Sequence, residues 1–173
     1  DKYGQILINK NLGKVYFENG DCANAEKNLK KALNIQNSFQ IDTFSVDIYR
    51  ALGDLSMHRE DPDAAIVYLE AERLELLKDK NISNEEKNDN AKKLALCYAK
   101  TNDVVKMNEY SEAYKNGEIG FSDLFNIGKE YLNSGDFEKA YDFLSNACSI
   151  NGVDEGEKAI ARIYKGKAGI QCR

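Results

Sequence analysis

The residue types that most often carry enzyme chemistry are few and scattered in this chain of 173 residues. His58 is the single histidine, so an HExxH zinc motif is excluded and a Ser-His or Cys-His pair would depend on it alone. No GxGxxG or GxxxxGKS/T loop is present to cradle a phosphate. The acidic pairs at Glu85-Glu86 and Asp154-Glu155 lack calcium-loop spacing and are typical of a solvated surface. We therefore expect no catalytic residues, no metal, no cofactor and no enzymatic activity.

Cysteines offer little more chemistry than the histidine. They form no CxxC pair and no dense framework, and their positions are Cys22, Cys97, Cys148 and Cys172. This spacing predicts reduced thiols in a helical core, with a disulfide or redox role as the alternative.

Composition narrows the class of protein. The chain is 42% hydrophobic and 31% charged and contains one proline, Pro62, which favours an all-α fold. Its net charge of −5 argues against broad nucleic-acid binding, and no apolar run is long enough to insert into a membrane. Because there is no initiator methionine and no signal peptide, we expect a fragment of a longer protein, cytoplasmic with a periplasmic location as the alternative.

Short turn segments that end in an aspartate recur along the chain. Three of them carry Gly20, Asn102 or Gly135 before the aspartate, residues that tolerate the left-handed conformation ending a helix. Glu60 departs from this rule, so the second turn is predicted to stop its helix more weakly, although Pro62 suits the next helix start. The aspartates, each a predicted N-cap, are Asp21, Asp61, Asp103 and Asp136.

Apolar residues keep a fixed register around each turn. Upstream, a large apolar residue precedes a small one at Leu12-Gly13, Leu52-Gly53, Leu94-Ala95 and Ile127-Gly128. Downstream, intervals of four and three residues place Ala25, Leu29 and Ala32, and later Ala140, Leu144 and Ala147, on one helix face. Each hairpin thus has an apolar face that it can bury only against the next hairpin.

This joint pattern resembles the tetratricopeptide repeat, which combines a Leu-Gly-x-x-Tyr element with spaced alanines in the second helix. The first and fourth repeats match well, whereas Ser56, Glu72, Met107 and Tyr114 depart from the pattern in the second and third. The resemblance implies a right-handed α-solenoid of antiparallel helix hairpins forming one domain over 1–173. The predicted helices pair 3–18 with 22–36, 42–58 with 62–79, 84–100 with 104–115, and 121–133 with 137–150, so the repeats span 3–36, 42–79, 84–115 and 121–150. A capping helix is expected at 153–165. The tail from Gly166 to Gly169 is expected to be frayed or, alternatively, to be the start of a missing continuation.

In the resembled family, the first helices line a concave groove that binds extended peptides or partner helices. Counting from the Leu-Gly element, the groove positions include Lys10, Asn11, Lys14, Arg50, Asp54, Lys92, Lys93, Asn126 and Lys129. This mostly basic row predicts binding of an acidic or C-terminal peptide, while the alternative is a row of solvated charges without a ligand.

The resemblance therefore implies a non-enzymatic scaffold for protein–protein interaction. The alternative is a regulatory or sensor segment of a larger signalling protein, such as a transcription regulator or kinase, that responds to a peptide or small ligand.

Overall fold

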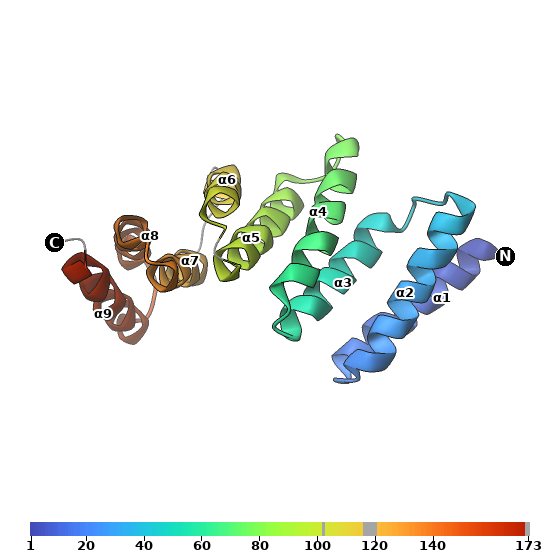
Figure 1. Cartoon of the computed structure of the whole chain (residues 1–173), viewed down its shortest axis with the longest axis horizontal. Coiled ribbons are helices and arrows are strands. Elements are labelled where there is room, and N and C mark those ends of the chain that lie inside the picture. Colours follow the sequence, from blue (N-terminus) through green and yellow to red (C-terminus); the bar gives the residue numbers. More distant parts are fainter. Residues whose placement is uncertain (102, 116–120, 172–173) are drawn as a thin grey trace. The chain divides into compact units, whose positions relative to one another are not determined.

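The computed structural model describes residues 1–101, 103–115 and 121–171, and these ranges form nine α-helices without a strand (Figure 1). The first helices are α1 (Lys2–Glu18), α2 (Cys22–Phe39), α3 (Ser45–His58) and α4 (Pro62–Lys78). The others are α5 (Asn84–Lys100), α6 (Val104–Lys115), α7 (Phe121–Ser134), α8 (Phe137–Ser149) and α9 (Glu155–Gln171). The predicted all-α fold is confirmed. None of the described helices is long and apolar enough to cross a membrane.

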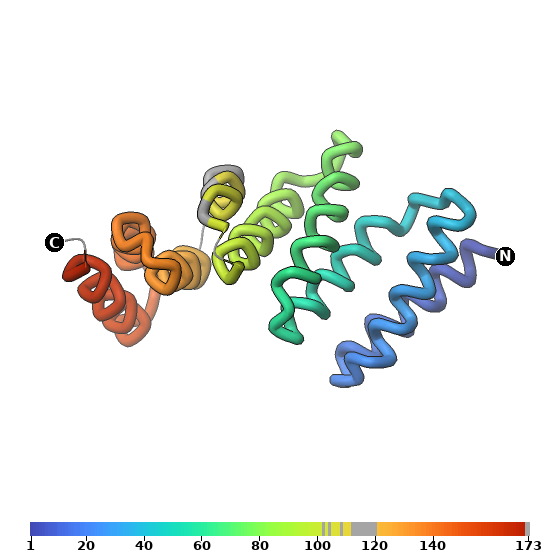
Figure 2. Tube along the Cα trace, in the orientation of Figure 1, coloured from blue at the N-terminus to red at the C-terminus, as the bar shows by residue number. Residues whose placement is uncertain are grey.

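The chain divides into two compact units, Asp1–Asn90 and Ala91–Arg173. In the first unit, the hairpins α1–α2 and α3–α4 stack through contacts of α3 with both α1 and α2. In the second unit, α8 packs against both α7 and α9. Figure 2 traces the chain through these hairpins. The expectation that residues 1–173 form one domain stays a prediction.

Close helix contacts at glycine explain why a small residue follows the large apolar one. A Cβ atom added to Gly13 would lie 2.5 Å from Cγ of Leu29, so only glycine allows this approach. The third hairpin has Ala95 at this position and Ser111 where the others carry the leucine. A Cβ atom added to Gly53 would lie 2.8 Å from Cδ2 of Leu69, and one added to Gly128 would lie 2.6 Å from Cγ of Leu144.

Turn geometry confirms the predicted caps. Each aspartate accepts a hydrogen bond from the backbone N–H three residues later, at Asp21, Asp61, Asp103 and Asp136. Gly20 and Gly135 adopt φ of 79° and 84°, as predicted for left-handed helix ends, and Asn102 lies outside the described residues. Glu60 also takes a left-handed φ of 57°, so the second turn has the same geometry, and the weaker stop expected there stays a prediction.

Helix boundaries depart from prediction by more than three residues only at the last helix. The frayed tail expected from Gly166 to Gly169 is wrong, since α9 continues to Gln171. Ala168 is fully buried, and a Cβ on Gly169 would lie 3.3 Å from the Tyr141 ring. Packing against α8 therefore outweighs the low helix propensity of the two glycines.

Candidate functional site

The groups that could carry covalent chemistry are the single histidine and the cysteine thiols. Burial raises the pKa of the Cys97 thiol to about 11, so this sulfur stays protonated near neutral pH. His58 is exposed at the end of α3, with its ring edge-to-face with Phe17 at 5.4 Å between centroids. Cys22, Cys97 and Cys148 are free thiols, and Cys172 lies outside the described residues. Within the described ranges, no three His, Cys, Asp or Glu side chains converge on a metal position.

A pocket of about 170 Å³ opens between α1 and α3 in the first unit. It brings together three of the predicted groove residues, Lys14, Arg50 and Asp54. Apolar and acidic side chains share the wall with them, so the pocket is amphipathic. The full lining is Lys14, Phe17, Glu18, Leu29, Asp47, Arg50, Ala51 and Asp54.

Lys10, another predicted groove residue, is buried and points at α3. Its Nζ lies 2.6 Å from Oδ2 of Asp47 and 5.3 Å from the centroid of the Phe44 ring. Partial burial would by itself raise the pKa of the Asp47 carboxyl, but the hydrogen bond from Lys10 and the nearby charges of Lys14 and Arg50 lower it overall. Lys10 therefore links α1 to α3, and the Asp47 carboxylate compensates its positive charge.

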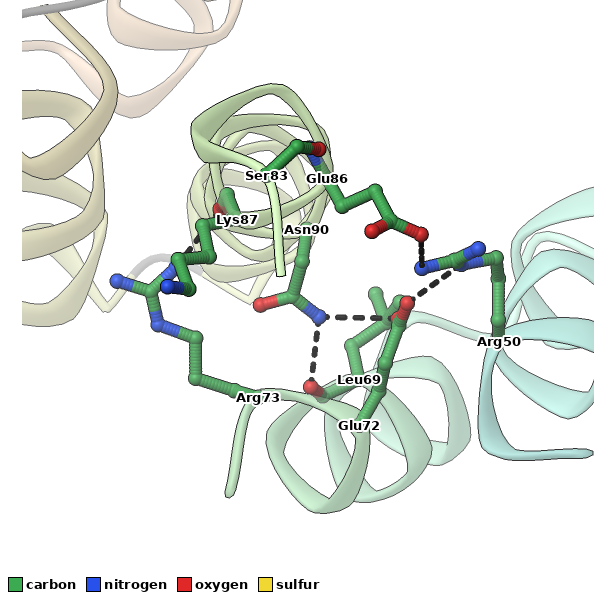
Figure 3. Close-up of polar contacts among 8 residues, drawn as sticks. All are labelled: Arg50, Leu69, Glu72, Arg73, Ser83, Glu86, Lys87 and Asn90. Carbon is green, nitrogen blue, oxygen red and sulfur yellow. Dashed lines mark hydrogen bonds and ion pairs between the residues drawn. The ribbon is translucent and has the colours of Figure 1, made fainter. Parts of the chain in front are cut away.

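Arg50 is likewise committed to partners within the chain (Figure 3). Its Nε donates to Oε1 of Glu72 at 2.6 Å, and its Nη2 donates to Oε1 of Glu86 at 3.2 Å. Burial opposes the charge of the guanidinium, but the two carboxylates more than offset this cost and raise the Arg50 pKa. Because Glu86 lies in the part of α5 that belongs to the first unit, Arg50 links α3 to α4 and to the start of α5.

Glu72 is the buried centre of this network. Only 1% of the residue is exposed, although Ala32 and Ala147 hold the same repeat position in the well-matched hairpins. The Asn90 amide nitrogen donates to Oε2 of Glu72 at 3.0 Å and to the carbonyl of Leu69 at 2.9 Å (Figure 3). The departure from the repeat pattern thus places a carboxylate, not a methyl group, between α3, α4 and α5.

Lys14 and Asn11 are exposed on the inner face of α1, whereas Asp54 is half-buried and engaged in a contact. Lys14 makes no ion pair within 4 Å among the described residues. Tyr3 and Leu7, which the sequence reasoning missed, are exposed and lie on the same helix face, at spacings of four and seven residues leading to Lys14. This spacing was available in the sequence, but the groove positions were counted only from the Leu-Gly element.

In the second unit, predicted groove residues also have neighbours in the chain. Lys92 Nζ lies 2.7 Å from Oδ1 of Asp123, and Lys93 is half-buried and engaged in a contact. Lys129 Nζ lies over two aromatic rings, 5.4 Å from the Phe125 centroid and 5.7 Å from the Tyr164 centroid. Asn126 is exposed. Carboxylates therefore pair with Lys10, Arg50 and Lys92, and aromatic rings lie beside Lys129. A continuous basic row along the chain stays a prediction.

The pocket between α1 and α3 offers an apolar floor of Phe17, Leu29 and Ala51 beside the exposed ammonium of Lys14. The Asn11 amide on the same face can exchange hydrogen bonds with a peptide backbone.

Comparison with known proteins agrees with the register of the hairpins. A family model described as the tetratricopeptide repeat matches residues 4–39 and 124–154. These ranges cover α1–α2 and most of α7–α8, the two hairpins whose sequence pattern is most complete. No curated protein matches the chain significantly. Tetratricopeptide repeats generally mediate protein–protein interactions and typically act as scaffolds without enzymatic activity. The two matches support the assignment of these hairpins to the tetratricopeptide repeat family.

Proposed function

We propose that the first unit binds an extended segment of a partner protein along the inner faces of α1 and α3. The observation that carries this proposal is the amphipathic pocket of about 170 Å³ between these helices. An apolar side chain of the partner enters the pocket against Phe17 and Ala51, and its backbone meets Asn11. The exposed Tyr3 and Leu7 extend the apolar contact along α1.

The charges around the pocket favour a partner with one carboxylate. Lys14 is the exposed cation of the lining, since Arg50 is bound to Glu72 and Glu86. Glu18 and Asp54 lie in the same wall and would repel a run of acidic residues. A chain terminus, or one acidic residue next to an apolar one, therefore fits better than an acidic tract.

A peptide array tests this proposal with the intact chain. Its peptides carry one apolar anchor and end in either a free carboxylate or an amide, and fluorescence polarisation then measures the affinity of the best peptide. Lys14→Glu is expected to weaken binding by at least about tenfold, since a charge-assisted hydrogen bond is replaced by repulsion. Lys31→Glu on the exposed side of α2 is the control, because it changes the net charge equally.

Equal affinity of the Lys14→Glu and Lys31→Glu variants would exclude this site. Lys10→Glu is unsuitable as a test, because a carboxylate there would face Asp47 and destabilise the contact between α1 and α3.

A further inference from the structure

Asparagine is followed directly by glycine at Asn19-Gly20, Asn116-Gly117 and Asn151-Gly152. Asparagine is a thermolabile residue, and in such a pair the backbone nitrogen of the glycine can attack the side-chain amide carbon of the asparagine. Glycine favours this attack because it has no side chain to block the approach. The pair at 116–117 lies outside the described residues. The other two pairs each follow the end of a helix and offer a matched comparison.

The two described pairs share their exposure and their local backbone conformation. Asn19 and Asn151 are both exposed, and so are the glycines that follow them. Gly20 and Gly152 adopt nearly the same left-handed φ, 79° and 77°. Among the described residues, nothing but chain neighbours would lie within 4 Å of a Cβ atom added to either glycine. Exposure and crowding therefore do not distinguish the two sites.

The hydrogen bonding of the glycine N–H groups does distinguish them. The Gly20 N–H donates to the carbonyl of Phe17 at 2.9 Å. In the turn between α8 and α9, the Ile150 N–H donates to the carbonyl of Ala147 at 3.2 Å, but the Gly152 N–H has no acceptor among the described residues. The attacking nitrogen is therefore held in the first turn and free in the second.

We propose that Asn151 is a site of spontaneous deamidation in the folded protein, and that the hydrogen bond of Gly20 protects Asn19. The Gly152 nitrogen loses its proton to solvent base and bonds to Cγ of Asn151, and the side-chain nitrogen leaves as ammonia. Water then opens the cyclic succinimide at one of its ring C–N bonds. Opening at one bond gives aspartate, and opening at the other gives isoaspartate, whose backbone runs through the side-chain carbon. Water is the only co-reactant.

This modification changes the connection between α8 and α9. Asp154 caps α9 by accepting hydrogen bonds from the N–H of Gly156 at 2.8 Å and of Glu157 at 3.3 Å. Isoaspartate at position 151 adds one backbone carbon between this cap and the end of α8, and it leaves a new carboxylate in the turn. The altered connection joins two helices that pack against each other.

Timed incubation of the intact chain at mildly alkaline pH, followed by trypsin digestion and tandem mass spectrometry, measures each site separately. Peptides 15–27 and 140–158 carry Asn19 and Asn151, and peptide 116–129 reports the third pair. We expect Asn151 in the folded chain to be converted at least about fivefold faster than Asn19, the factor expected from one backbone hydrogen bond. Methylation by an isoaspartyl methyltransferase identifies isoaspartate among the products.

The same incubation in urea is the control for sequence effects, because it removes the hydrogen bond of Gly20. Asn19 and Asn151 are then expected to react at similar rates. Asn151→Gln should stop the conversion at that site, since glutamine would have to close a larger ring, and should leave the rate at Asn19 unchanged. Circular dichroism checks that this variant keeps the helical content of the wild type.

Three results would overturn the proposal. One is conversion in the folded chain that is as fast at Asn19 as at Asn151, or faster. Another is a folded chain in which Asn151 is not converted at all. The third is a difference between the two sites that persists in urea, because the sequence around each pair, and not the hydrogen bond, would then set the rate.

Discussion

The hairpins α1–α2 and α3–α4 share a glycine–leucine contact and an aspartate cap but differ in the polar groups that they bury. Both place a glycine of the first helix against a leucine sixteen residues later, and both begin the second helix with an aspartate cap. Yet the first hairpin buries Ala32 where the second buries the Glu72 carboxylate. The family model matches residues 4–39 but no part of α3 or α4.

This difference shows that the residues that keep the hairpin geometry are not all of the residues that make up the family pattern. The close glycine contact and the aspartate cap suffice to keep the backbone geometry, because they set the helix separation and the helix start. The alanine and tyrosine positions tolerate polar replacements when the buried groups are paired, as Arg50 and Asn90 pair Glu72. The second hairpin therefore depends on an ion pair that the first does not have.

Breaking that ion pair should have the largest effect on stability. Arg50→Met leaves the buried Glu72 carboxylate without its cation and should lower the free energy of unfolding by about 3–5 kcal/mol, measured by urea denaturation of the intact chain. Arg59→Met removes an exposed arginine from its surface pair with Glu26 and should cost about 1 kcal/mol or less.

Combining Arg50→Met with Glu72→Met sharpens the same comparison. This double variant should be more stable than Arg50→Met alone, because no uncompensated charge remains buried. A double variant less stable than the single one would show that the network contributes more than charge compensation.

Much of the fold could be predicted from sequence because its determinants are local. Aspartate caps, glycine turns and apolar spacing each act within one hairpin, so the predicted helices follow the structure closely. The predicted last helix ends too early because Gly166 and Gly169 have low helix propensity, whereas in the structure Ala168 packs in the core. Helix propensity describes single residues and therefore does not predict this contact with another helix.

The candidate site was only partly predictable for the same reason. Counting along the repeat placed Lys14, Arg50 and Asp54 near one another, and the structure joins them in one pocket. The same count could not show that Asp47 neutralises Lys10 from the neighbouring helix. The pairing depends on how α1 and α3 pack against each other, and the sequence of a single repeat does not predict this.

The glycine contacts should give the next largest effect and should be alike in the two hairpins. Gly13→Ala and Gly53→Ala each force a methyl group against a leucine, which should cost about 1–3 kcal/mol of stability. Gly166→Ala is the control, since nothing lies within 4 Å of a Cβ there and alanine favours the helix. The hypothesis fails if all three variants change the unfolding free energy in the same direction.

A smaller effect is expected at the turn residues. Glu60 holds the left-handed conformation that Gly20 supplies in the first turn. Glu60→Gly should therefore stabilise the chain by up to about 1 kcal/mol, and Gly20→Glu should destabilise it by a similar amount. Thermal unfolding monitored by circular dichroism measures both, and a loss of stability in Glu60→Gly would contradict the role of backbone strain.

The Lys10–Asp47 pair should add a pH dependence of small size, because Asp47 is only half-buried. Its folded-state pKa is lowered from the ordinary 3.8, so its contribution is complete above that value and is lost as the pH falls through the folded-state pKa. Asp47→Asn should make urea stability less dependent on pH in this acidic range. An unchanged pH profile would mean that the pair contributes nothing to folding.

Nuclear magnetic resonance tests the proposed binding surface most directly. The best peptide from the array is titrated into the isotopically labelled intact chain, and the backbone amides that shift are mapped. We expect the largest shifts at Asn11, Lys14, Ala51 and Asp54, on the inner faces of α1 and α3. Shifts confined to the exposed sides of α2 and α4, with these four amides unchanged, would contradict binding between the inner helices.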